Sequence, residues 1–136
     1  MNNIKIKIEN KLYVMKLIIE QYKGGVISLE GSFDILHFNN FEDIKYENYQ
    51  KHKRNTTYPI QSFVVFPLTD NNLNLLEKFF HNIGIKKNIE HLIITYEDNI
   101  VFATYDNFHP KCIYFSDTFN LDLLKKLKND KYIIEE

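Results

Sequence analysis

Two apolar segments separated by three polar residues constrain the fold of this chain more than any other feature. Residues 89–96 and 100–105 are rich in β-branched and aromatic side chains, and the polar residues 97–99 lie between them. Short runs of this kind, joined by a few turn residues, are typical of a β-hairpin. A third run, residues 112–116, extends the hairpin into a meander. This part of the chain therefore predicts antiparallel strands.

The spacing of apolar residues predicts the remaining elements. The predicted strands are residues 4–9, 26–30, 33–38 (a hairpin closed at Gly31-Ser32), 60–66, 89–96, 100–105, 112–116 and 132–134. The predicted helices are residues 12–22, stopped by Gly24-Gly25; residues 40–49; a helix capped by Thr69 or Asp70 with apolar residues from Leu73 to Ile83; and a last one capped by Asp117 or Thr118 with Leu121, Leu124 and Leu127 on one face. Consecutive hairpins with helices between them indicate a single α+β domain over residues 1–136. Its sheet is expected to be mostly antiparallel, with the helices packed on one side.

Composition excludes several classes of protein. Hydrophobic residues make up 44% of the 136 residues, which is enough to build one core and excludes an intrinsically disordered chain. The apolar runs are too short to span a bilayer, and the N-terminus, MNNIKIKIENK, lacks the apolar region of a secretory signal. One cysteine excludes an intramolecular disulfide framework. We therefore expect a cytoplasmic protein.

The only cysteine, Cys112, lies three residues after His109, which raises the question of a catalytic or metal site. A structural zinc site needs about four nitrogen or sulfur ligands. The other histidines are scattered without ligand spacing: His37, His52, His81 and His91. Residues 107–111 are rich in turn formers, so we interpret them as a turn that leads into a strand, with Cys112 buried. The sequence thus predicts no catalytic residue, no metal site and no cofactor.

Charge is unevenly distributed along the chain, although the formal net charge is only −1. Residues 28–50 contain five acidic residues and one lysine, and residues 89–122 contain six acidic residues and one lysine. If these two acidic tracts converge in space, they form a negative patch that attracts a basic partner. The basic segment 51–54 is too isolated to give the dominant basic face of a nucleic-acid binder, so we do not expect nucleic acid as a partner.

A small α+β protein with local acidic tracts resembles the immunity proteins of bacterial toxin–immunity systems, including those of contact-dependent growth inhibition. The resemblance is one of size, charge pattern and fold class over the whole chain. The abundance of Asn, Ile and Lys, which have A/T-rich codons, indicates an AT-rich gene. The resemblance implies a non-catalytic protein that neutralises a cognate toxin by occupying its active site or an exosite. A nuclease toxin presents a basic cleft to phosphate, and an acidic surface rimmed by aromatic side chains is complementary to such a cleft.

This hypothesis selects acidic and aromatic residues as partner contacts. The predicted contacts are Glu30, Asp34, Glu42, Asp43, Tyr46, Glu47, Tyr49, Glu97, Asp98 and Asp106. One alternative is a small-ligand or catalytic domain with a pocket between sheet and helices, lined by Phe and Tyr side chains and by His91 or His109. A second alternative is a structural module that associates with itself through an exposed strand edge or an aromatic patch.

Overall fold

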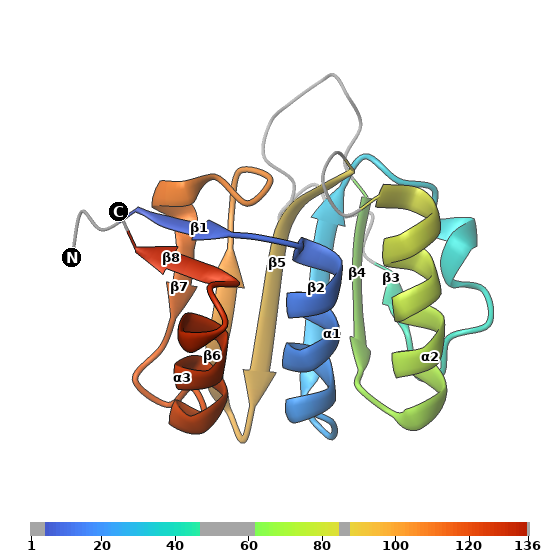
Figure 1. The fold of residues 1–136 in the computed structure, drawn as a ribbon. Coiled ribbons are helices and arrows are strands. Elements are labelled where there is room, and N and C mark those ends of the chain that lie inside the picture. Colours follow the sequence, from blue (N-terminus) through green and yellow to red (C-terminus); the bar gives the residue numbers. More distant parts are fainter. Residues whose placement is uncertain (1–4, 47–61, 85–87, 136) are drawn as a thin grey trace.

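The fold is that of a computed structural model, which describes residues 5–46, 62–84 and 88–135 (Figure 1). The strands are β1 (Ile6–Ile8), β2 (Val26–Gly31), β3 (Lys45–Tyr46), β4 (Ser62–Pro67), β5 (Ile89–Tyr96), β6 (Asn99–Thr104), β7 (Ile113–Phe115) and β8 (Ile133–Glu135). The helices are α1 (Lys11–Gln21), α2 (Asp70–Phe79) and α3 (Leu121–Asn129), with 3₁₀ turns at Ile35–Phe38 and Pro110–Cys112 and a π turn at Phe80–Gly84. None of the helices in these ranges is long and apolar enough to cross a membrane.

A six-stranded antiparallel sheet organises the molecule, in the order β3-β4-β2-β5-β6-β7. The three helices lie side by side over one face of this sheet, with α1 between α2 and α3 (Figure 1). Strands β1 and β8 pair antiparallel in a separate two-stranded sheet. The prediction of an α+β fold with a mostly antiparallel sheet and helices on one side is therefore confirmed.

The hairpin predicted from residues 89–105 is formed by β5 and β6. Its turn residues Glu97 and Asp98 have positive φ angles of 49° and 64°, which is the backbone that a tight two-residue hairpin turn requires. Strand β7 then pairs with β6 and completes the meander. The last predicted strand is also confirmed, because β8 returns to pair with β1 at the other end of the chain.

Apolar side chains from the sheet and the helices fill the space between the two layers. On β2, Ile27 and Leu29 alternate with more exposed residues and face this core. Apolar side chains with at most 1% of their surface exposed come from all three helices, from four strands, from the 3₁₀ turn Ile35–Phe38 and from the residue after β4: Val14, Met15, Ile18, Ile19, Ile27, Leu29, Phe38, Val64, Phe66, Leu68, Leu76, Ile89, Leu92, Ile94, Phe102 and Leu127. Burial of this apolar layer is the main force that holds the helices on the sheet.

The predicted strand over residues 33–38 is wrong, and so is the hairpin turn at Gly31-Ser32. The chain leaves β2 and forms the 3₁₀ turn Ile35–Phe38, because Oδ1 of Asp34 accepts a hydrogen bond from the N–H of Leu36 at 2.9 Å. Phe33 and Phe38 both point into the core, where their rings lie 5.4 Å apart. Because Phe33 and Phe38 are an odd number of positions apart, a strand would have placed their rings on opposite faces of the sheet. Packing of both rings into the core therefore excludes the strand that the alternating pattern predicts.

The predicted helix over residues 40–49 is also wrong within residues 40–46. Residues 45–46 form the edge strand β3, in which Lys45 pairs with Val65 and Tyr46 with Val64. The backbone N–H and C=O of Glu42 bind the side chain of Asn72 instead of entering a helical ladder. Residues 47–49 and the basic segment 51–54 lie outside the described residues.

The interpretation of the His109–Cys112 segment as a turn is confirmed. His109 is exposed, and its Nδ1 accepts a hydrogen bond from the N–H of Lys111 at 3.1 Å, which caps the 3₁₀ turn before β7. Cys112 is half-buried, less deeply than predicted. Among the described residues, no group of three or more His, Cys, Asp or Glu side chains could hold a metal ion.

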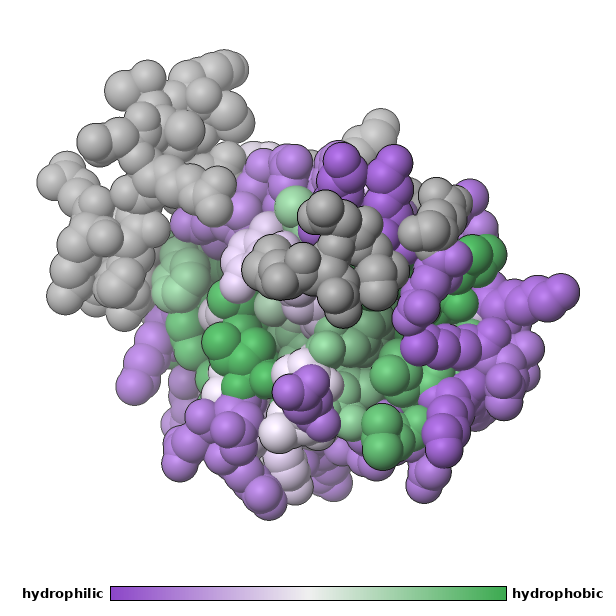
Figure 2. Space-filling model, turned by 90° about the vertical axis from the view of Figure 1, so that its left-hand side faces the viewer, coloured by the Kyte–Doolittle hydropathy of each residue, from purple (hydrophilic) through white to green (hydrophobic). Residues whose placement is uncertain are grey.

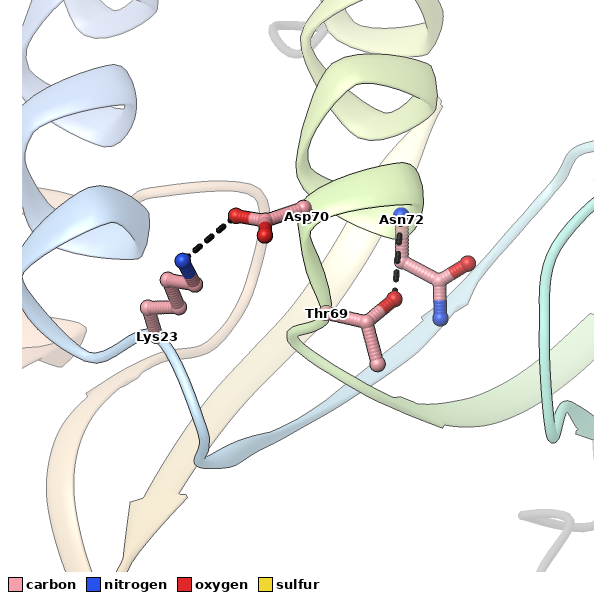
Figure 3. A network of polar contacts seen from close by, with 4 residues as sticks. All are labelled: Lys23, Thr69, Asp70 and Asn72. Carbon is pink, nitrogen blue, oxygen red and sulfur yellow. Dashed lines mark hydrogen bonds and ion pairs between the residues drawn. The ribbon is translucent and has the colours of Figure 1, made fainter.

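The start of α2 is tied to its surroundings by four polar residues (Figure 3). Thr69 caps the helix as predicted, since its hydroxyl accepts the N–H of Asn72 at 3.2 Å, and Asp70 pairs with Lys23 at 2.6 Å. The Asn72 amide is completely buried. Its Oδ1 accepts the N–H of Glu42 at 2.8 Å, and its Nδ2 donates to the carbonyls of Glu42 and Pro67 at 3.0 and 2.8 Å. Asn72 thus joins the segment before β3 to the end of β4.

We expect Asn72→Ala to lower the free energy of unfolding by about 2–4 kcal/mol, because three backbone groups lose their partner inside the protein. Urea denaturation measures this loss. The neighbouring Asn71 is exposed, and its Nδ2 donates two long bonds, to the carbonyl of Asn40 at 3.3 Å and to Oδ1 of Asn72 at 3.4 Å. Asn71→Ala leaves the bonds from Asn72 to Glu42 and Pro67 in place, so it is the control and should cost less than about 0.5 kcal/mol. Equal losses in the two variants would contradict the assigned role of Asn72.

Candidate partner-binding groove

A groove runs between α1 and α3 and continues to the turn between β5 and β6. It consists of two adjoining hollows of about 530 and 310 Å³ that share Gln21 and Asn120. The larger hollow is lined by Leu17, Glu20, Gln21, Asn120, Asp122, Leu123 and Lys126, and the smaller by Gln21, Tyr22, Tyr96, Glu97, Asn99, Val101, Thr118 and Asn120. We call this surface the α1–α3 groove.

The sheet topology brings these segments together. Helix α1 runs toward the sheet end where β2 begins, and α3 starts at that same end, after β7 (Figure 1). The turn that joins β5 to β6 lies there as well. The C-terminus of α1, the N-terminus of α3 and the hairpin turn therefore surround one site.

Tyr22 is buried and lines the smaller of the two hollows. Its ring packs 5.5 Å from the rings of both Tyr96 and Phe119, and its hydroxyl accepts the backbone N–H of Asn120 at 2.7 Å. Burial raises the pKa of the Tyr22 hydroxyl above its ordinary value, so the phenol is neutral at physiological pH. Asn120 in turn caps α3 by accepting the N–H of Leu123 at 2.8 Å. The residue that caps the end of α1 thus holds the start of α3 in place.

The rim of the groove is acidic. Its lining contains three carboxylates, Glu20, Glu97 and Asp122, and one base, Lys126, which gives a net charge of 1 − 3 = −2. Two more acidic residues next to the lining in sequence are exposed: Asp98, which follows Glu97, and Asp117, which precedes Thr118. The last turn of α1 contains no basic residue, so nothing in that turn offsets the partial negative charge of the helix C-terminus. The groove therefore favours a cationic group.

The second acidic tract contributes only part of its length to this site. Glu97 lines the groove and Asp98 follows it in the turn, whereas Asp106 lies beyond the opposite end of β6. A strand advances about 3.4 Å per residue, so Asp106 is roughly 20 Å from the turn. The structure brings Glu97 and Asp98 together but separates Asp106 from them.

The first acidic tract lies elsewhere. Asp34 caps the 3₁₀ turn after β2, and Glu42 and Asp43 are exposed before the edge strand β3. Strand β3 is three strand spacings from β5, so it lies about 14 Å from the hairpin across the sheet. Tyr46 belongs to β3. The remaining predicted contacts, Glu47 and Tyr49, lie outside the described residues.

Glu30 is not an exposed contact. Its carboxylate lies 3.4 Å from Nε2 of His91 on the neighbouring strand, and the two side chains are only 12% and 10% exposed. The ring of Tyr105 lies 5.3 Å from that of His91. By strand alternation this pair occupies the sheet face opposite the helices, since the residues next to it, Leu29 and Leu92, face the core.

Several lining residues were absent from the predicted contacts. Glu20 and Gln21 lie in α1, whereas Asn120 and Lys126 belong to α3 and its cap, and nothing in the local sequence of these two segments indicates that they meet. Asp122 belongs to the second acidic tract but is not among the predicted contacts. The predicted cap of this helix, Asp117 or Thr118, is also wrong, because the structure has Asn120 as the cap and Asp122 in the first turn. The run Asn120-Leu-Asp122 could have located this helix start, because asparagine is a preferred N-cap and an acidic residue favours the first turn.

A second cluster of charged residues lies on the other side of α1. It borders a smaller hollow of about 220 Å³ lined by Leu12, Lys16, Glu77, Phe80 and His81. Burial raises the pKa of the Glu77 carboxyl; Lys16 lowers it, and a hydrogen bond and like charge from Glu20 raise it again. Ionisation of Glu77 is therefore less favourable in the folded protein than in the unfolded chain.

This raised pKa predicts a stability that depends on pH. The contribution of Glu77 is fully present below its ordinary pKa of 4.5 and is lost as the pH rises through the raised value. Glu77→Gln, which stays neutral, should therefore increase the free energy of unfolding at pH 7 and leave it unchanged below about pH 4. Urea titrations at the two pH values measure the effect. A variant that is less stable than the parent at pH 7 would contradict the assignment.

Comparisons with protein-family models, with curated proteins and with solved structures found no match to this chain. The functional inference therefore depends on the geometry and charge of the α1–α3 groove.

Proposed function

We propose that this chain is a non-catalytic binding protein that neutralises a toxin by holding a basic segment of it in the α1–α3 groove. The observation that carries the proposal is the convergence of Glu20, Glu97 and Asp122 around one open groove. A partner with the opposite charge gains both attraction at long range and contact in the groove.

The groove suits the side chains of lysine and arginine. Its walls include the apolar Leu17 and Leu123, which can contact the aliphatic part of a long basic side chain while the carboxylates receive its charge. Tyr96, which is half-buried, adds an aromatic surface beside Glu97. These walls are open to solvent, which a macromolecular partner needs.

A nuclease domain is the toxin class that this groove matches best. Such a domain must present basic residues to nucleic-acid phosphates, and an acidic protein that covers them prevents substrate binding. The resemblance of the chain to small immunity proteins in size, fold class and charge agrees with this choice. In such systems the toxin is expected from the gene upstream of the immunity gene, which provides a partner to test.

We expect a double variant, Glu97→Lys with Asp122→Asn, to lose protection against that toxin. The full chain is co-expressed with the C-terminal domain of the upstream product, and growth rescue and co-purification are measured. The two substitutions remove two negative charges from the groove and add one positive charge, which changes its net charge from −2 to +1. Binding should weaken by at least about tenfold, and the parent's affinity should fall as salt increases.

The matched control is Glu42→Lys with Asp43→Asn, which makes the same charge change near β3, away from the groove. Both residues have exposed side chains. The control should keep rescue and affinity close to those of the parent. Equal losses in the two double variants would show that net charge alone acts, and full rescue by the groove variant would contradict the proposal.

The alternative function, ligand binding or catalysis, has one observation in its favour. A carboxylate and an imidazole, Glu30 and His91, lie together beside Tyr105 on the sheet face away from the helices. If this pair carried the activity, Glu30→Gln would abolish rescue in a protein that still folds, while the groove variant would retain it. We expect the reverse order of effects.

A further inference from the structure

The edge strand β7 has an unpaired side. Hydrogen bonds from the N–H of Tyr105 to the carbonyl of Cys112 (3.0 Å) and from the N–H of Ser116 to the carbonyl of Val101 (3.1 Å) flank its pairing with β6. Antiparallel pairing alternates along the strand, so Tyr114 also directs its backbone groups toward β6. The N–H and C=O groups of Ile113 and Phe115 therefore point away from the sheet.

No further strand follows β7 in the sheet formed by the described residues. This side of the molecule also carries apolar surface, seen in Figure 2 as a green band framed by polar residues. Large apolar side chains exposed on the elements of this side are Tyr114 of β7 (36%), Leu121 of α3 (64%) and Ile134 of β8 (37%). An open strand edge next to apolar surface is a site where another strand can add to the sheet.

We propose that the strand that adds here is β7 of a second copy of this chain. A symmetric antiparallel pair centred on Tyr114 places Ile113 of one copy opposite Phe115 of the other, and all four outward-pointing backbone groups of each copy then form hydrogen bonds. Tyr114 of one copy faces Tyr114 of the other as a close cross-strand pair. The two sheets join into one.

The charges that flank β7 support a second copy as the occupant. Lys111 and Asp117 each lie three residues from Tyr114, on opposite sides, and both are exposed. Lys111 belongs to the 3₁₀ turn that precedes β7 and Asp117 follows the strand, so the symmetric antiparallel pair brings the basic end of each β7 close to the acidic end of the other, twice. This edge is complementary to itself, whereas a strand of another protein would need the same charge order by coincidence.

The test uses sedimentation of the full chain over a concentration series. We expect a monomer–dimer equilibrium that Lys111→Asp and Asp117→Lys each weaken by at least about tenfold, because each change creates two repulsive pairs. The charge-swapped double variant, with both substitutions, should restore the affinity to near that of the parent. Lys45→Asp, the same substitution on the edge strand β3, is the control and should leave the dimer unchanged.

A chain that stays monomeric up to about 1 mM would overturn the proposal. So would a dimer that neither single substitution weakens, or a double variant that stays as weak as the single ones. Loss of the dimer in Lys45→Asp would also overturn the proposal, because a charge change away from β7 would then weaken the dimer as well. Thermal melting of each variant checks that it folds. The Lys111→Asp result is independent of the toxin assay, since neither Lys111 nor β7 contributes a residue to the α1–α3 groove.

Discussion

The pairing of β2 with both β4 and β5 is the constraint on which the rest of the structure depends. It places β2 near the centre of the sheet and requires the chain after β4 to cross over through α2 before it enters β5. The close approach of the strands explains two glycines. A Cβ on Gly31 would lie 1.9 Å from the carbonyl oxygen of Asn88, and one on Gly25 would lie 2.5 Å from that of Thr95. Larger residues would push β5 away from β2.

The groove is a consequence of this topology. Because α1 ends where β2 begins, and α3 starts where β7 ends, the two helices meet with opposite polarity at one end of the sheet. Tyr22 fixes this arrangement through its hydrogen bond to Asn120, and the carboxylates on the rim come from α1, α3 and the hairpin. Which acidic side chains can act together therefore depends on where the fold places them. It depends less on how densely acidic residues occur along the chain.

Much of the fold could be predicted from local patterns, and part of the site could not. The β5–β6 hairpin, α1 and the Thr69 cap depend on neighbours in sequence, and these predictions are confirmed. The segments from Phe33 to Tyr46 were predicted wrongly because distant partners, the Phe38 cluster and the Asn72 amide, decide their conformation. Glu97 could be proposed as a contact because it lies in a predicted turn. Its position around one groove with Glu20 and Asp122 depends on tertiary structure, which no local pattern encodes.

The most direct test of the central claim is an NMR titration of the ¹⁵N-labelled chain with an arginine-rich peptide, which imitates a basic partner segment. The account predicts saturable shifts at the amides of Gln21, Asn99 and Asn120, which disappear at high salt together with the binding. Amides near the acidic residues Asp34, Glu42 and Asp106 should change little. Shifts of similar size around all of these acidic residues would contradict the account, because the peptide would then be responding to charge without recognising the groove.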